Sequence, residues 1–385
     1  MALPLPDRGI VFSPVGGGDS ITVVVDAETI VQIDVHHAAD AENEDDPRVA
    51  IVDELIDSLP TRDGKPYLAV FGATHLDTDH ICGFKRLLDE EVTIGDLWFT
   101  PRVLWDQDEL SDDAKAFRDE AERRINKLKA DGEVGSGDRI RIIGYHDSLK
   151  EHSDIYENLP EGAVTVPGSE FTALDGEDFD GTFRAFVHAP FKEDGDKDRN
   201  DTSFGLQITL TDGDQDLKAI VLGDLAYPTV NQIFERSDDE DLEFDVFLAP
   251  HHCSKSVMYW KGDSDEEERQ QGVLESIEAA ARDGAHIVAS CGPVPATNKP
   301  GDNPPHANAA DRYRELVDNE HFLCTGEHPT EDAPEPIVFE LSSGGVALRT
   351  TETSASSRSS RLGEAVKTAR GAAAPAAQPV GFGRA

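Results

Sequence analysis

Three apolar segments with the character of buried strands run directly into residues that can bind metal ions. "YLAVFGAT" leads to His75, "AIVLG" leads to Asp224, and "FLAP" leads to His251 and His252. Loops at strand ends are where layered α/β folds gather their functional residues. Helix caps and turns explain single Asp residues at such positions, but they do not account for three segments of this kind. We therefore expect a fold in which the three strand ends meet.

The order of the remaining segments predicts a layered α/β architecture. Residues 20–35 read as two β-branched strands around a turn, residues 45–60 as a helix closed by Pro60, and residues 67–74 as a buried strand followed by a helix. Five further strands lie between residues 183 and 292, and a hairpin closes the pattern at 336–350. A polar helix over residues 108–133 separates two halves of similar β-then-α order, and we interpret it as a surface insertion.

The composition limits the partners of the chain. Its 385 residues carry a formal net charge of −42, and the acidic residues are spread along the whole length. We interpret this excess as a solvated acidic surface, as in proteins adapted to high salt, with an acidic face for a basic partner as the alternative. In either case the charge opposes non-specific binding to nucleic acid, whose phosphates would be repelled.

The sequence also gives expectations about location and about the two ends. It has no apolar run of the roughly 18 residues needed to cross a bilayer, and its first residues lack the pattern of a signal peptide. We therefore expect a cytoplasmic protein with no membrane partner. The four cysteines form no C-x-x-C pair and are expected to be reduced. Residues 351–385 are rich in Ser, Ala and Pro without periodicity, which predicts a disordered tail after a domain spanning residues 1–350.

The spacing within "THLDTDH" suits two neighbouring metal ions. His75 and Asp77 lie two residues apart and face one way in an extended loop, whereas Asp79 and His80 turn toward a second position. Two ions about 3.5–4 Å apart acidify water held between them and yield a hydroxide nucleophile near neutral pH. Asp224 has two carboxylate oxygens and could bridge both ions, with an imidazole of the His251–His252 pair completing one of them.

These motifs together resemble the metallo-β-lactamase fold, in particular the hydrolase domain of the ComEC/Rec2 DNA-uptake proteins. The resemblance covers residues 10–348 and is carried by four features in order, namely "VGGGDSITVVV…VQIDV" with Asp34, "THLDTDHICG", "NDTSFGLQI", and "VLGDL" with "APHHCSKS". It implies an αββα sandwich with a helical insertion and metal-dependent hydrolysis. The membrane channel of the DNA-uptake proteins has no counterpart here, so the uptake role is not carried over.

The resemblance also implies roles for single residues. It makes His75, Asp77, Asp79, His80, Asp224 and His252 the metal ligands. It places His251 toward the substrate, Lys255 near an anionic substrate oxygen, and His306 as a substrate contact or proton donor; a helix-cap neighbour is the alternative for His306, and an ordinary surface lysine for Lys255. Asn200 and Asp201 stand where other branches supply a third histidine ligand. Cys82 and Cys253 replace glycines of that branch, either as small buried residues or as soft ligands or a redox pair near the site.

The predicted cofactors are two divalent metal ions, either Zn²⁺ or Mn²⁺. Replacing histidine by aspartate shifts the preference somewhat toward Mn²⁺. The leading functional hypothesis is a phosphodiesterase or nuclease that acts on a small molecule or a short nucleic acid through a metal-bridged hydroxide. The alternatives are hydrolysis of a carboxylic ester, lactone or thioester, and a metal-stabilised regulatory or binding protein with little turnover. The oligomeric state is not predicted.

Overall fold

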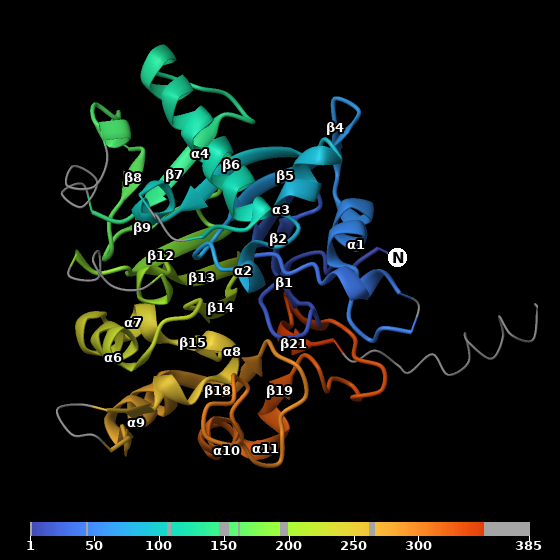
Figure 1. Ribbon diagram of the computed structural model, residues 1–385, viewed down its shortest axis with the longest axis vertical. Helices are drawn as coiled ribbons and strands as arrows, with labels where there is room; N and C mark the ends of the chain where they lie inside the picture. Colours follow the sequence, from blue (N-terminus) through green and yellow to red (C-terminus); the bar gives the residue numbers. More distant parts are fainter. Residues whose placement is uncertain are drawn as a thin grey trace, which may run out of the picture. The chain divides into compact units, whose positions relative to one another are not determined.

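The first large sheet contains β5, the strand that leads to His75. The computed structural model describes residues 2–43, 45–105, 109–145, 154–160, 162–192, 199–261 and 266–349 (Figure 1). The first sheet has the strand order β21-β20-β1-β2-β3-β5-β6-β7-β8, with β4 beside β5. Its strands are β1 (Gly9–Phe12), β2 (Ile21–Asp26), β3 (Thr29–Ile33), β4 (Thr61–Arg62), β5 (Lys65–Gly72), β6 (Thr93–Phe99), β7 (Arg139–Ile143), β8 (Val164–Thr165), β20 (Ile337–Ser342) and β21 (Gly345–Leu348).

Helices connect the parallel strands of this sheet and cover its outer face. Strands β3, β5, β6, β7 and β8 are parallel neighbours, and parallel strands need crossover connections. The crossovers contain α1 (Ile51–Ser58), the short α2 (Thr78–Ile81), α3 (Phe84–Asp89) and α4 (Asp112–Asp131). Helix α4 begins at the cap residue Ser111, whose side chain accepts a hydrogen bond from the Ala114 N–H.

Helix α4 is more than the surface insertion that its polar sequence indicates. Its side chains Phe117, Ala121 and Ile125 are fully buried, and the Phe117 ring lies 4.8 Å from that of Phe84 in α3. The helix follows β6 and precedes its parallel neighbour β7. It therefore belongs to the helical layer over the first sheet, with its many charges on the solvent side.

The second sheet carries the other two strand ends. Its order is β19-β18-β15-β14-β13-β12-β9, antiparallel from β9 to β14 and parallel from β14 to β19. The strands are β9 (Glu170–Phe171), β12 (Phe183–Ala189), β13 (Gly205–Asp212), β14 (Gln215–Val221), β15 (Phe244–Leu248), β18 (Ala281–Ala289) and β19 (Phe322–Cys324). The outer face is covered by α6 (Tyr227–Arg236), α9 (Gln271–Ala280) and α10 (Ala307–Leu316).

The inner faces of the two sheets share one apolar core. Val31 and Val70 of the first sheet are buried in the same cluster as Leu206 and Val221 of the second. Separate clusters fill the space between each sheet and its own helices. Burying one such aliphatic side chain contributes roughly 1.5–3 kcal/mol, so the inner cluster holds the sheets face to face. The predicted αββα sandwich is confirmed.

The closing hairpin joins the two halves of the chain. Strand β20 pairs antiparallel with β1, with Phe339 opposite Ile10, and β21 pairs with β20. Residues Met1–Leu348 form one compact unit, and the predicted disordered tail at 351–385 lies outside the described residues. Within the described residues, every helix is too short or too polar to cross a bilayer.

Candidate metal centre

The three strand ends that the sequence singles out meet at one place between the sheets. The loop after β5 carries His75 to His80, the turn after β14 carries Asp224, and the turn after β15 carries His251 and His252. Asp224 lies at the centre and is buried. Its Oδ1 and Oδ2 atoms face two different groups of side chains, which we call the Oδ1 side and the Oδ2 side.

On the Oδ1 side, four possible ligand atoms lie at the separations of a tetrahedral metal site. Nε2 of His80 lies 3.0 Å from Oδ1 of Asp224 and 3.2 Å from Nε2 of His252. The His252 Nε2 atom is 3.5 Å from the same Oδ1 and 3.4 Å from Oδ2 of Asp79. Ligands 2.0–2.1 Å from a tetrahedral ion are about 3.3–3.4 Å from one another. The donor set and its spacing therefore fit a divalent ion.

The second nitrogen of each of these rings is held by the protein. Nδ1 of His80 lies 2.8 Å from Oδ2 of Asp34, and Nδ1 of His252 lies 3.1 Å from the carbonyl oxygen of Ser290. A carbonyl oxygen only accepts, so the His252 Nδ1 atom carries the proton and a neutral ring has its lone pair on Nε2. Two lone pairs 3.2 Å apart repel unless a proton or a metal ion lies between them. Anchoring of this kind is typical of histidine ligands.

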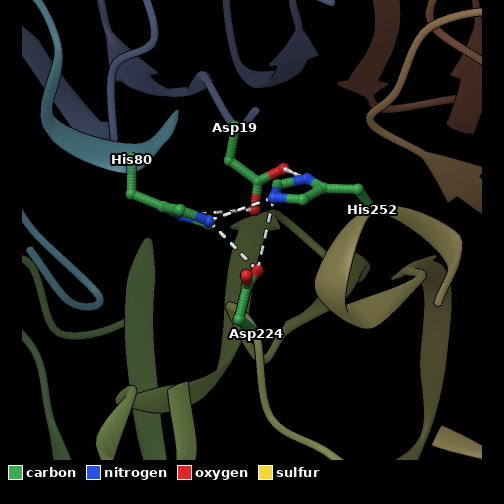
Figure 2. A group of neighbouring side chains, drawn as sticks. All are labelled: Asp19, His80, Asp224 and His252. Carbon is green, nitrogen blue, oxygen red and sulfur yellow. Dashed lines mark hydrogen bonds and ion pairs between the residues drawn. The ribbon is translucent and has the colours of Figure 1, made fainter. Parts of the chain in front are cut away.

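Asp19 lies beside the Nδ1 atoms of the same two rings and was missed by the sequence analysis. It lies with its Oδ1 atom 3.4 Å from Nδ1 of His252 and its Oδ2 atom 3.9 Å from Nδ1 of His80. Figure 2 shows the four buried residues of the candidate metal site, Asp19, His80, Asp224 and His252, converging from separate segments. Asp19 is part of "GGGDS", a segment that the family resemblance includes. Because no histidine or cysteine lies close to it in sequence, nothing marked it as a possible metal ligand.

Close backbone packing places Asp19. Its N–H donates to the carbonyl oxygen of Asp79 over 3.1 Å, and the Ser290 hydroxyl donates to the carbonyl oxygen of Gly18 over 2.7 Å. A Cβ atom at Gly18 would lie 2.2 Å from Nδ1 of His36 and 2.6 Å from the Asp79 carbonyl oxygen. Only glycine therefore permits this approach.

The Oδ2 side is more widely spaced. Oδ2 of Asp224 lies 3.6 Å from Nε2 of His251 and 3.9 Å from Nε2 of His75. Nε2 of His75 is also 3.7 Å from Oδ2 of Asp77. This nitrogen is buried and has no hydrogen-bond partner among the residues that the structure describes, a situation that costs roughly 1–3 kcal/mol in a folded protein. An ion bound among these three residues and Asp224 would remove that cost.

Left-handed backbone directs the two adjacent histidines to different oxygens of Asp224. His251, His252 and Cys253 have φ angles of 53°, 53° and 65°, a conformation that costs of order 1–3 kcal/mol for each non-glycine residue. The two rings are almost perpendicular, at 86°. The sequence predicts that only one of the pair meets a metal ion. Both face Asp224 here, and the ligand role of His252 and the substrate-facing role of His251 remain predictions.

The two sides also differ in their electrostatics. Burial alone would lower the pKa of His252, but Asp224 and Asp19 outweigh it and raise the pKa to about 10. The pKa of His80 is likewise raised well above its usual value against burial, by Asp224 and Asp34. On the Oδ2 side burial prevails, lowering the pKa of His75 to about 4 and that of His251 below its usual value. Burial would raise the pKa of Asp224, but His80 and His252 hold it well below the usual range.

A cavity of about 600 Å³ opens on the Oδ2 side. It is lined by Asp77, Glu109, Arg199, Asn200, Asp201, Asp224, Ala226, His251, Ser256 and Trp260. Arg199 donates from Nη1 to Oδ1 of Asp77 over 2.8 Å, so its guanidinium lies beside a predicted metal ligand. Neither Arg199 nor Trp260 was singled out from the sequence, because an isolated Arg or Trp carries no recognisable spacing.

Two other predicted residues lie along a neighbouring cavity. The Lys255 ammonium pairs with Glu267, with Nζ 2.7 Å from Oε2. His306 is the N-terminal cap residue of α10, and its Nδ1 accepts from the Lys255 N–H over 3.2 Å. Its Nε2 lies 3.2 Å from the carbonyl oxygen of Asp302. Both residues line a cavity bordered by Thr297 to Asp302, and their predicted substrate roles remain predictions.

The two cysteines beside the metal-binding loops contact protein atoms. Cys82 is half-buried, and its Sγ donates to the carbonyl oxygen of His37. Cys253 is fully buried, and this burial raises the pKa of its thiol. Neither belongs to the candidate metal site of Asp19, His80, Asp224 and His252.

Comparisons with known proteins give structural similarity and no sequence relative. The sequence matches no family model and no curated protein. Among solved structures, the Rm3 metallo-β-lactamase is 16% identical, with coverage of 73% of this chain and 91% of that one and a TM-score of 0.33. The subclass B3 metallo-β-lactamase BJP-1 of Bradyrhizobium japonicum is 12% identical, with coverage of 82% and 90% and a TM-score of 0.31. The class B3 di-zinc metallo-β-lactamase LRA-12 from an Alaskan soil metagenome is 11% identical, with coverage of 72% and 91% and a TM-score of 0.32.

These TM-scores are low, so the fold assignment depends on the sheet order and layers of this chain. The finer resemblance to the ComEC/Rec2 hydrolase domain remains a prediction.

Proposed function

We propose that this chain is a metal-dependent hydrolase whose site holds two divalent ions, Zn²⁺ or Mn²⁺, one on each side of Asp224. The observation that carries the proposal is the position of Asp224, whose two oxygens face two separate groups of histidines and carboxylates. His80, His252 and Asp79 would hold one ion and His75 and Asp77 the other, and Asp224 would be shared by both. Two ions held by these residues would acidify a bound water and would neutralise charge that develops on the reacting oxygens.

The protein residues have defined roles in such a reaction. Asp34 and the Ser290 carbonyl fix the His80 and His252 rings with Nε2 toward Asp224. His251 lines the cavity, and burial lowers its pKa, so the ring is neutral at pH 7. A neutral imidazole in this position can accept a proton from the attacking water and pass it to the leaving oxygen.

A phosphodiester is the bond that we propose, in a small molecule or a short nucleic acid. Paired ions 3.5–4 Å apart would suit an in-line displacement at phosphorus because they would stabilise both the attacking and the leaving oxygen.

The localisation that we propose for the protein, on the basis of its sequence, is cytoplasmic.

Hydrolysis of a carboxylic ester, lactone or thioester is the second candidate. It is favoured by the acidic lining of the cavity, where Arg199 is the single cationic side chain among the ten described lining residues. The ammonium of Lys255 is paired with Glu267. An ester needs less positive charge around the reacting centre than a phosphodiester does.

A comparison of substrates on one preparation tests the proposal. The protein is stripped of metal, reloaded separately with Zn²⁺ and Mn²⁺, and assayed with bis(4-nitrophenyl) phosphate, a lactone, a thioester and single-stranded DNA. We expect phosphodiester cleavage that requires the added metal. Cleavage of the lactone or thioester with no phosphodiester cleavage under either metal would exclude the phosphodiesterase assignment. Failure to bind either metal would exclude the hydrolase itself.

A further inference from the structure

The cavity beside the metal centre has an uneven charge distribution. Four carboxylates line it, those of Asp77, Asp224, Glu109 and Asp201. The first two face histidines of the metal centre, whereas Glu109 and Asp201 extend the acidic lining beyond it. A polynucleotide brings one negative charge per nucleotide, so phosphates flanking the scissile one would meet these carboxylates and be repelled. The lining therefore favours a substrate that is charged only at the reacting group.

An indole ring lies in the same cavity. Trp260 lies in the short strand β16 (Tyr259–Trp260), which pairs with β17 (Glu268–Arg269), Trp260 opposite Glu268. Successive side chains of a strand point to opposite faces. Both residues are half-buried. Tyr259 packs against the outer core of the second sheet, whereas Trp260 lines the cavity. The Tyr227 ring lies 6.3 Å from the indole and supports it.

The positions of Trp260 and Arg199 complement one kind of ligand. A flat ring can stack on the indole, and stacking on an aromatic side chain tolerates many ring structures because each offers a π-face. Arg199 supplies the single positive side chain among the described lining residues, next to Asp77. Charge and aromatic surface therefore lie in one cavity with the predicted metal ligands.

We propose that the cavity selects a small phosphodiester with a single negative charge and a planar ring that stacks on Trp260, and that it discriminates against polynucleotides. This inference rests on the proposed phosphodiesterase function. It makes Trp260 a specificity-determining residue and Arg199 the one cationic side chain, among the described lining residues, that could contact the phosphodiester.

Binding probes test the ring preference without turnover. Calorimetric titration of the metal-loaded protein with methyl phenylphosphonate and methyl methylphosphonate compares two monoesters that each carry one negative charge, like a phosphodiester. We expect the phenyl compound to bind at least about tenfold tighter. Trp260→Ala should reduce this ratio to about twofold or less, and Trp260→Phe should retain most of it. Trp105→Ala is the matched control, because Trp105 lines a separate cavity with Phe191 and its loss should leave the ratio unchanged.

Turnover gives the second readout. Trp260→Ala should raise KM for bis(4-nitrophenyl) phosphate about tenfold with a smaller change in kcat, and a single-stranded 20-mer should be cleaved at least about 100-fold more slowly than that compound. The protein could cleave phosphodiesters while Trp260→Ala leaves the ratio of the phenyl and methyl affinities unchanged. That result would overturn the inference about Trp260 but not the proposed function. Equal cleavage of the 20-mer would overturn the single-charge requirement. If the affinity ratio depends on Trp260 but the protein cleaves no phosphodiester, the proposed function is overturned instead.

Discussion

The two sides of Asp224 differ in the spacing of their possible ligand atoms and in the exposure of their histidines. On the Oδ1 side, His80 and His252 are buried, their Nε2 atoms lie 3.2 Å apart, and both Nδ1 atoms are anchored by Asp34 and Ser290. On the Oδ2 side, His251 and His75 lie 3.6 and 3.9 Å from the carboxylate, and the side chain of His251 is 27% exposed. The first position is preorganised for an ion, whereas the second borders the cavity where a substrate would arrive. We infer that the Oδ1 side binds its ion more tightly and that the Oδ2 side exchanges its ion more easily.

The largest effect should come from removing the residue that both sides share. Asp224→Asn leaves an amide that cannot serve two ions as a carboxylate does, so metal content should fall from two ions to one or fewer. Turnover should then drop by roughly 10³-fold or more. Elemental analysis after gel filtration and an activity assay provide the measurement. Asp216→Asn, near the start of the strand β14 that Asp224 follows, is the matched control. Two retained ions in Asp224→Asn would refute the bridging role.

The adjacent histidines allow the two sides to be separated. His252→Ala should weaken the tighter ion by at least about 100-fold, since it removes a ligand that the protein has oriented. His251→Ala should retain the ion on the Oδ1 side. It should either lose the ion on the Oδ2 side together with activity, or lose activity without any loss of metal. Competition titrations with a chromogenic chelator distinguish the two outcomes. Equal losses in the two variants would show that the sides are not different.

The smallest expected effect is on the pH dependence of stability without metal. The pKa of His252 is raised to about 10 in the folded protein, against about 6.5 in an unfolded chain. Its stabilising contribution is therefore complete below pH 6.5 and is lost as pH rises toward and through 10. The melting temperature of the chelator-treated protein should fall by roughly 5 °C or more between pH 6.5 and 10.

Metal should remove this dependence, because an ion competes with the proton for Nε2. His252→Ala should make the curve of the metal-free protein less steep and leave the part due to His80, whose pKa is also raised. A metal-free melting temperature that rises over this pH range would contradict the protonated state of the Oδ1 side.

The sequence predicted most of the sandwich because strand and helix periodicities are local. The segments ending at His75, Asp224 and His251 each carry their own apolar pattern, so their roles as strands could be assigned without tertiary information. Helix α4 was correctly placed in sequence, but its buried face was underestimated because charged residues surround Phe117 and Ile125. Its role in the helical layer depends on the parallel pairing of β6 and β7, which no local pattern encodes.

The site was predictable only as far as its spacing was recognisable. The repeated His and Asp residues of "HLDTDH" point to metal binding by themselves. Asp19 lies some 60 residues earlier and reaches the site only because the inner faces of the sheets and the tight turn at Gly18 bring it there. The same limit applies to Lys255, whose pairing with Glu267 depends on a partner 12 residues away and on the local turn.

The pairing of β20 with β1 has a consequence for the order of events during synthesis. The first sheet lacks its outer strands until residues 337–348 have left the ribosome. At roughly 5–20 residues per second, this happens on the order of tens of seconds after β1 has been made. Until then β1 presents an open edge on which another chain could pair. The predicted metal ligands follow strands of both sheets and all precede β20, so a nascent chain would contain them before the first sheet is closed. Loading with metal is therefore expected to follow the pairing of β20 with β1.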